Sequence, residues 1–276
     1  MKGMNNLTSN SDVDMGVDPY NLRPVWDAIL DLYKRFDAYC KKYQLRYYVT
    51  GGTLLGAVRH DGFIPWDDDF DVVMPRPDYQ RFLELVKSDR IANAQIVAKE
   101  LDLSWSQWFA KVFETRQDVI NRIKDESRLD LSDGICIDVI PIDGMPKATL
   151  PFYYWVIKRS TWRHARKGFV WKILWGLLWG REKDAASFFS FERWLASYPY
   201  DSSPAVEDYN ANGRRFRMRA LTATSFGEPV WHKFDCVKVP MPQAWERFLG
   251  VIFGDWRQLP PVEKRVPSHQ ALVGVR

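Results

Sequence analysis

The first part of the chain passes from a helical pattern of apolar residues to a strand pattern. Residues 25–43 carry an apolar stripe with charges between its members, which predicts an amphipathic helix lying on a sheet. The members of this stripe are Val25, Ile29, Leu32, Phe36 and Tyr39. Residues 47–49 favour a strand and residues 53–58 a helix. Residues 69–74 alternate and then become apolar, as a strand entering a core does.

Helical and strand patterns continue to alternate along the rest of the chain. Further helices are expected at residues 77–87 and 243–252. Further strands are expected at residues 95–99, 108–113, 135–144 and 236–240. This mixture predicts an α/β fold, built as a mixed sheet of the α+β kind with helical elaborations.

Composition divides the chain into four parts. Residues 1–18 are polar and acidic without the apolar run of a signal peptide, so a disordered leader is expected. Residues 19–145 form the expected catalytic core, residues 146–235 a helical insertion rich in tryptophan and basic residues, and residues 236–276 a C-terminal segment that closes on the core. The three cysteines are far apart, which predicts neither a disulfide framework nor a zinc site and favours a cytoplasmic location.

Four aspartates lie within residues 67–71, directly before the apolar part of a predicted strand. Like carboxylates so close together favour a bound cation, and Mg²⁺ is the cation that suits hard oxygen ligands. Asp69 and Asp71 share one face of the strand and are the predicted metal ligands. Asp68 falls on the other face and Asp67 precedes the strand, so both are expected to play a supporting role. The alternative is an acidic turn that solvates the end of a strand.

Other candidate site residues lie on both sides of this run. Asp138 stands in the middle of a nearly apolar strand, where an ionised carboxylate is costly unless it is paired, so it is the predicted third metal ligand. Asp143, beside Gly144, is typical of a turn. Gly51 and Gly52 end a strand and begin a helix, a favourable place for a phosphate.

Two further polar side chains extend this picture. Thr53 is placed to cap the helix that follows the glycines and to offer a hydroxyl group. Lys111, in an otherwise apolar run, is a candidate for binding donor phosphates. The alternative for Lys111 is a side chain that extends from an edge strand into solvent.

These motifs together resemble the LicD/fukutin family of phosphotransferases. The resemblance rests on Gly-Gly-Thr, on residues 59–66, on Asp-Asp-Asp-Phe-Asp, on residues 137–144, and on C-terminal motifs between residues 237 and 265. It implies a nucleotidyltransferase-like core that transfers a phospho-alcohol, most often phosphocholine, from a CDP-activated donor to a sugar hydroxyl of lipopolysaccharide or teichoic acid.

The resemblance also implies roles for single residues. Two Mg²⁺ ions held by Asp69, Asp71 and Asp138 would bind the donor diphosphate, and Asp138 could receive the acceptor proton. Arg59 and His60 are candidates for neutralising the charge of the leaving nucleotide. A loop histidine bonded to the backbone is the alternative for His60.

Basic residues and tryptophans are interleaved in residues 151–181. Residues 169–180 are too short to span a bilayer, but tryptophan with Lys and Arg fits a helix lying at the inner membrane face. An aromatic core under a basic face is the alternative. The same composition can bind single-stranded nucleic acid, so a nucleotidyltransferase acting on RNA or on a small molecule is the runner-up function. A catalytically inactive glycan-binding or scaffold protein is disfavoured by the intact aspartates, and no nucleic acid partner is expected.

Overall fold

The computed structural model describes residues 20–105, 107–126, 129–131, 134–145, 197–203, 205–208, 221–267 and 271–272. Its helices are α1 (Arg23–Lys42), α2 (Gly51–His60), α3 (Arg76–Leu85), α4 (Gln117–Glu126), α8 (Ala223–Phe226), α9 (Trp245–Phe253) and the 3₁₀ helix η3 (Val262–Lys264). Its strands are β1 (Tyr48–Val49), β2 (Asp71–Pro75), β3 (Ala94–Val97), β4 (Ala110–Glu114), β5 (Leu129–Asp130), β6 (Cys136–Met145), β7 (Ala205–Asp208), β8 (Val230–Phe234), β9 (Val237–Met241) and β10 (Ala271–Leu272).

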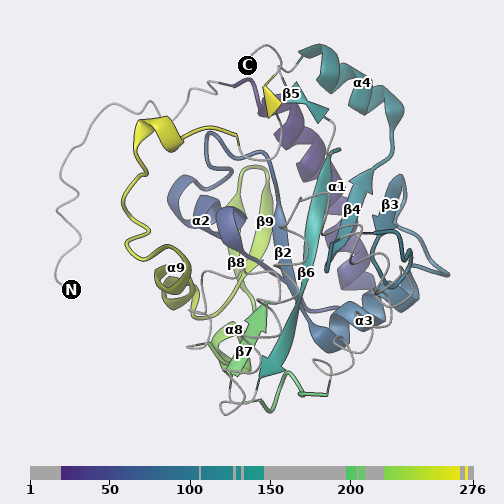
Figure 1. Ribbon diagram of the computed structural model, residues 1–276, viewed down its shortest axis with the longest axis vertical. Helices are drawn as coiled ribbons and strands as arrows, with labels where there is room; N and C mark the ends of the chain where they lie inside the picture. The colour runs from purple at the N-terminus through teal and green to yellow at the C-terminus, as the bar shows by residue number, and fades with distance from the viewer. Residues whose placement is uncertain are drawn as a thin grey trace, which may run out of the picture.

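A mixed sheet forms the centre of the molecule (Figure 1). Its strand order is β1-β2-β6-β4-β3, and β7 pairs with the second half of β6. Strands β2 and β6 run parallel, whereas β1–β2, β4–β6, β3–β4 and β6–β7 are antiparallel. The predicted α/β fold with a mixed sheet is therefore confirmed. The smaller hairpin β8–β9 lies against β1 and α2.

The core explains why these segments form these elements. The stripe predicted for residues 25–43 becomes the buried face of α1, which packs across β4 and β6 (Figure 1). Tyr33 of α1 contacts Phe70 at a ring-centroid distance of 5.0 Å, and Phe70 in turn meets Phe234 of β8 at 5.5 Å. Val72 and Val73 of β2 are fully buried. These apolar residues anchor β2 in the core. The aspartates that precede them therefore lie at the N-terminal end of the strand.

The prediction that Asp143 is a turn residue is wrong. Asp143 lies inside β6, is 1% exposed, and accepts two hydrogen bonds from Arg76 at the start of α3, at 2.6 and 2.7 Å. The next residue, Gly144, leaves no room for a side chain because Ser203 and two backbone carbonyls crowd it. The pair joins α3 to β6, since two buried charges require each other.

Several predicted segments lie outside the described residues. These are the leader at residues 1–18, the tryptophan-rich segment at residues 169–180, and most of the insertion at residues 146–235. The division into four parts therefore stays a prediction. Within the described ranges, no helix combines the length and the apolar composition needed to cross a lipid bilayer.

Candidate active site

Strand pairing places Asp71 and Asp138 side by side. They are direct partners in the register of the parallel strands β2 and β6. The N–H of Asp138 donates to the carbonyl of Phe70 at 2.9 Å, and the N–H of Thr50 donates to the carbonyl of Asp71 at 3.1 Å. Both aspartates lie near the start of their strands. The structure therefore brings together two of the three predicted ligands that are far apart in sequence.

Asp67 adds a further carboxylate to this place. Its side chain is hydrogen-bonded to that of Asp69, and burial, followed by the charges of Asp69, Asp71 and Asp68, raises the pKa of Asp67 well above its ordinary range. We expected Asp67 only as a supporting residue before the strand. Asp68 is 3% exposed. The alternation of residues 67, 69 and 71 is the sequence signal for the contact of Asp67 with Asp69, which the expectation for Asp67 did not include. We call the acidic cluster the set Asp67, Asp69, Asp71 and Asp138.

The two glycines allow the carboxylates to approach the start of α2. A Cβ atom on Gly51 would lie 2.9 Å from Oδ2 of Asp71, and one on Gly52 would collide with Oδ2 of Asp67. Gly51 also has a φ of +53°, which favours glycine. Negative charge beside a helix N-terminus is stabilised by the helix dipole. Close approach to the aspartates thus explains the Gly-Gly pair, while phosphate binding there stays a prediction.

Thr53 fixes the position of Asp71 and does not cap the helix. Helix α2 begins at Gly51, so its N-cap residue is Thr50. The buried hydroxyl of Thr53 accepts a hydrogen bond from the N–H of Asp71 at 2.8 Å. The predicted capping role is wrong, because the glycines form the first turn of the helix and do not precede it. Thr53 instead ties α2 to the first residue of β2.

Lys111 forms an ion pair with Asp138 of the acidic cluster. Its Nζ atom lies 2.8 Å from Oδ1 of Asp138 and 3.6 Å from Sγ of Cys136. Burial opposes the charged form of Lys111, but Cys136 and Asp138 outweigh burial and raise its pKa. The edge-strand alternative is wrong, because β4 lies between β6 and β3. Lys111 therefore stays charged beside a catalytic candidate.

Arg59 and His60 at the end of α2 have different properties. Nε of Arg59 donates to Nε2 of His60 at 2.9 Å, and burial followed by the charge of Arg59 lowers the pKa of His60 to about 4. This low pKa favours the neutral form of His60 at pH 7, and its role in neutralising the charge of the leaving nucleotide stays a prediction. The other end of the Arg59 side chain reaches the carbonyl of Trp256 at 3.4 Å. The C-terminal segment thus contacts the site helix.

The acidic cluster fits magnesium by the chemistry of its donors. Carboxylate oxygens are the ligands that Mg²⁺ prefers, and the raised pKa of Asp67 indicates excess negative charge. As they stand, no three His, Cys, Asp or Glu side chains of the described residues are arranged to hold one metal ion. Magnesium, expected as two ions bound to Asp69, Asp71 and Asp138, therefore stays a prediction.

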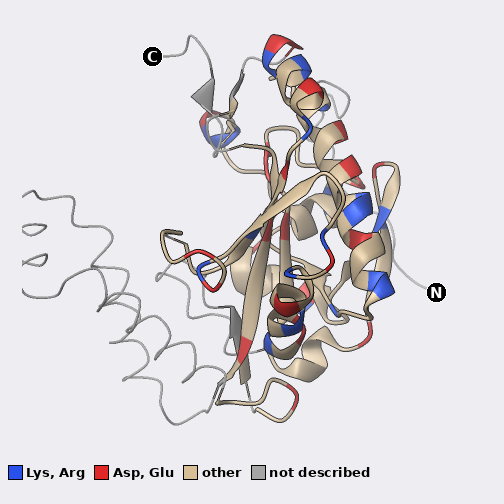
Figure 2. Cartoon of the chain, turned by 90° about the vertical axis from the view of Figure 1, so that its right-hand side faces the viewer, with Lys and Arg blue, Asp and Glu red and all other residues tan. Residues whose placement is uncertain are grey.

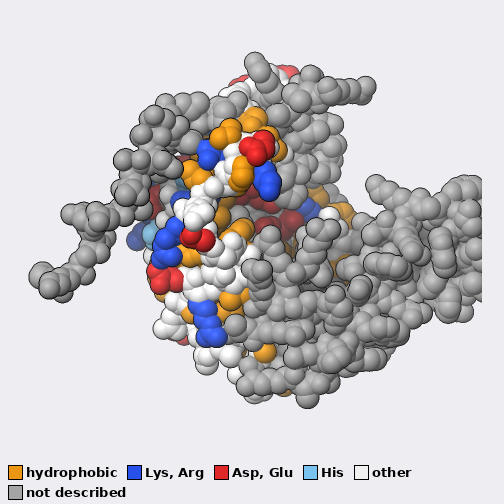
Figure 3. Space-filling view, turned by 60° about the vertical axis from the view of Figure 1, so that its left-hand side comes forward, with side chains coloured by type: hydrophobic (Ala, Val, Ile, Leu, Met, Phe, Trp, Pro, Cys, Tyr) orange, Lys and Arg blue, Asp and Glu red, His pale blue; other side chains and the backbone are white. Residues whose placement is uncertain are grey.

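Figures 2 and 3 show where charge gathers. Acidic residues lie within neighbouring strands in the middle of the sheet, whereas many other charges lie on helices and loops (Figure 2). In the space-filling view, acidic side chains are visible in a recess near the centre of the face, with basic and hydrophobic side chains beside it (Figure 3). Such a recess suits a substrate that carries phosphate groups only if cations accompany the carboxylates.

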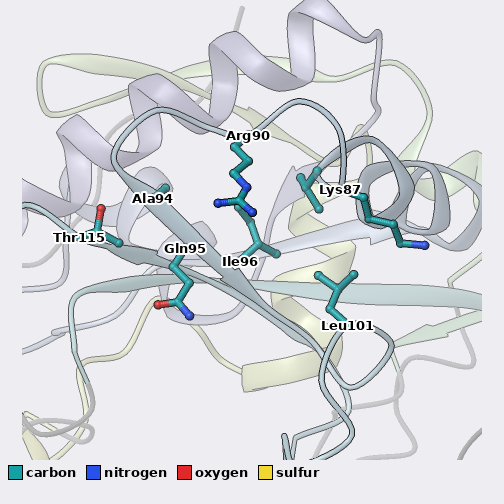
Figure 4. A pocket seen from close by; sticks show the side chains of 8 residues that line it. Lys87, Arg90, Ala94, Gln95, Ile96, Leu101 and Thr115 are labelled. Atoms are coloured by element: carbon teal, nitrogen blue, oxygen red, sulfur yellow. The ribbon is translucent and has the colours of Figure 1, made fainter.

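A separate cavity of about 470 Å³ lies along β3 (Figure 4). Its polar lining comes from Lys87, Arg90, Gln95 and Thr115, and Ile96 and Leu101 contribute apolar surface. The cavity contains no carboxylate and none of the predicted site residues. We therefore assign it no part in the chemistry.

Comparison with known proteins bears on the same region. Residues 44–131 match the family model described as LicD/FKTN/FKRP, nucleotidyltransferase domain. The chain is similar to the lipopolysaccharide cholinephosphotransferase LicD of Haemophilus influenzae, with 24% identity over 257 residues that cover 87% of this chain and 92% of the relative. Shorter matches reach uncharacterized proteins of Rickettsia typhi, 44% identical over 45 residues, and Rickettsia prowazekii, 51% identical over 37 residues. These two matches cover 16% and 13% of this chain, and 15% and 14% of the relatives.

The resemblance predicted from the motifs is thereby confirmed. The family model covers the Gly-Gly pair, the acidic run and Lys111, and it ends before Asp138. The similarity to the Haemophilus protein extends over most of the chain.

Proposed function

With this chain as a LicD-type phosphotransferase, we propose that it transfers phosphocholine from a CDP-linked donor to a sugar hydroxyl of lipopolysaccharide. The similarity to a lipopolysaccharide cholinephosphotransferase supports this choice of group and acceptor. Teichoic acid is the alternative acceptor. The observation that carries the proposal is the pairing of Asp71 with Asp138, beside the carboxylates that lie against Gly51 and Gly52.

The reaction is a displacement at the phosphorus atom that carries choline. The acceptor oxygen forms a bond to this phosphorus, the bridging P–O bond of the diphosphate breaks, and CMP leaves with the bridging oxygen. The hydroxyl proton goes to a carboxylate, for which Asp138 is placed at the cluster. Lys111, bound to Asp138 at 2.8 Å, holds that carboxylate in position. Bound Mg²⁺ would neutralise the charge of the donor phosphates.

The functional test is transfer by the purified full chain from CDP-choline to lipopolysaccharide with Mg²⁺, measured as CMP release. We expect Asp71→Asn and Asp138→Asn each to lower the rate at least about a hundredfold, because loss of a metal ligand costs more than loss of an outer contact. The melting temperature should change little. Asp102→Asn, an exposed loop residue, is the matched control and should retain full activity. Near-normal rates in both site variants would remove the assignment.

The runner-up function is that of a nucleotidyltransferase that acts on RNA or a small molecule. It is supported by the match of residues 44–131 to a family model described as a nucleotidyltransferase domain. The same protein can be tested by thermal stabilisation with CDP-alcohols, nucleoside triphosphates and short RNAs in the presence of Mg²⁺. Stabilisation by a triphosphate and by none of the CDP-alcohols would favour the runner-up. Contact with the inner membrane face, proposed from residues 169–180, does not affect this comparison.

A further inference from the structure

Arg265 is held by contacts within its own segment and with distant parts of the chain. Its Nε atom donates to the carbonyl of Pro260 at 2.9 Å. Its own carbonyl accepts a hydrogen bond from the hydroxyl of Tyr20 at 2.7 Å. The side chain is half-buried, whereas its neighbours Lys264 and Val266 are exposed. Arg265 is therefore a positioned residue within a mostly exposed segment.

The guanidinium of Arg265 lies over the aromatic ring of Trp66. The guanidinium carbon lies 5.6 Å from the ring centroid of Trp66, within the range of a cation–π contact. Trp66 directly precedes Asp67, a member of the cluster. A guanidinium held on this ring retains donor groups for a further partner, because Nε alone is used by Pro260.

Arg59 supplies a second guanidinium at the same place. It lies seven residues after Gly52 on α2, which is two helical turns along the same face. Burial, followed by the charge of Arg265, lowers the pKa of Arg59, and Asp67 partly offsets this effect. Within the described part of the chain, neither arginine forms an ion pair with a carboxylate. Two neighbouring half-buried guanidiniums, whose positive charge Asp67 offsets only in part, form a site for an anion.

We propose that Arg265 and Arg59 together bind the diphosphate of the nucleotide-linked donor at its departing phosphate. This inference rests on the proposed function. Asp71 and Asp138 mark the end of the site where the new bond forms, and the arginines lie toward the other end of α2. When the bridging P–O bond breaks, its electron pair stays on the departing phosphate. The two guanidiniums then bind a group whose negative charge has increased, which favours the transition state.

The test measures binding of inorganic pyrophosphate and of CDP-choline to the full chain by calorimetry with Mg²⁺. Arg265→Gln should weaken both about tenfold or more, because a hydrogen bond to a charged group is worth at least that factor. Arg257→Gln is the matched control, since Arg257 belongs to the same segment and also lies over a tryptophan, Trp256, at 4.1 Å. Arg257 is near Glu246, and its loss should change affinity less than about twofold.

Each outcome separates this inference from the proposed function. Equal binding of both ligands by wild type and Arg265→Gln would overturn the role of Arg265 and leave the transferase intact. Arginine-dependent binding of pyrophosphate without any transfer from CDP-alcohols would retain the anion site and overturn the proposed function. Failure of wild type to bind either ligand would overturn both. If Arg265→Gln does not fold, pyrophosphate should protect Arg265 of the wild type from phenylglyoxal, and unprotected reaction would overturn the inference.

Discussion

At the scale of single residues, the carboxylates of the acidic cluster repel one another. Asp67 shows this most clearly, because burial and then its aspartate neighbours favour its protonated form. Carboxylates that repel one another are retained at sites where a cation or a reacting group balances them. The glycines and Thr53 hold this arrangement in place, since Gly51 and Gly52 admit the carboxylates and Thr53 binds the backbone of Asp71. The cluster is therefore the best candidate for the functional site among the described residues.

The first prediction at this scale concerns Asp67→Asn. The folded-state pKa of Asp67 lies above the unfolded value, so the folded protein holds more protons and its stability falls as pH rises through that interval. Without divalent cations, Asp67→Asn should be more stable than wild type by about 1 kcal/mol at pH 8, and the gain should vanish at low pH. Chemical denaturation over a pH series measures this.

The control for that series is Asp125→Asn on the exposed side of α4. A surface change of this kind should stay within about 0.5 kcal/mol at every pH. A destabilised Asp67→Asn, or an unchanged pH dependence, would contradict the account of Asp67.

At the scale of elements, two connections bring the catalytic candidates together. The parallel pairing of β2 with β6 aligns Asp71 and Asp138. The buried Arg76–Asp143 pair then locks α3, which follows directly on β2, to the second half of β6. The two side chains are 4% and 1% exposed, so water screens their charges less than it screens those of a surface ion pair. This pair holds the two site strands in register.

Asp143→Asn should destabilise the protein by about 3 kcal/mol or more, because it leaves the buried guanidinium without its charged partner. Urea denaturation gives the free energy of unfolding. Asp201→Asn removes the exposed partner of Arg46, whose ion pair measures 3.0 Å, and should cost less than about 1 kcal/mol. Equal effects of the two substitutions would contradict the structural role of the buried pair.

At the scale of the whole molecule, the candidate site draws on segments at both ends of the described chain. Residues 51–71 supply the glycines and most carboxylates, β6 supplies Asp138, and the C-terminal segment supplies Arg265. The net charge of +4 is small, so the acidic recess is a local feature of the surface and does not reflect the whole molecule (Figures 2 and 3). A donor bound there would link the start of α2 with the C-terminal segment.

Hydrogen exchange with CDP-choline and Mg²⁺ tests this linkage. Amides of residues 51–60 and 256–265 should exchange more slowly together, by up to about a hundredfold at a ligand concentration of a hundred times Kd. Residues 94–97, beside the cavity of Figure 4, serve as the internal control and should not change. Protection confined to residues 51–60 would exclude the C-terminal segment from the donor site, and protection of residues 94–97 would point to the cavity.

Local pattern alone determined the elements and the kind of chemistry. Helix α1 and strand β2 follow from apolar periodicity, and the acidic run with its glycine pair indicates a charged site, because periodicity and residue type act over a few positions. Only the tertiary structure decided which of these side chains lie beside one another. Asp138 beside Asp71, Lys111 on Asp138 and Arg265 over Trp66 depend on strand register and on chain segments far apart in sequence. No local pattern encodes such contacts, because they arise only when packing selects one arrangement of the elements.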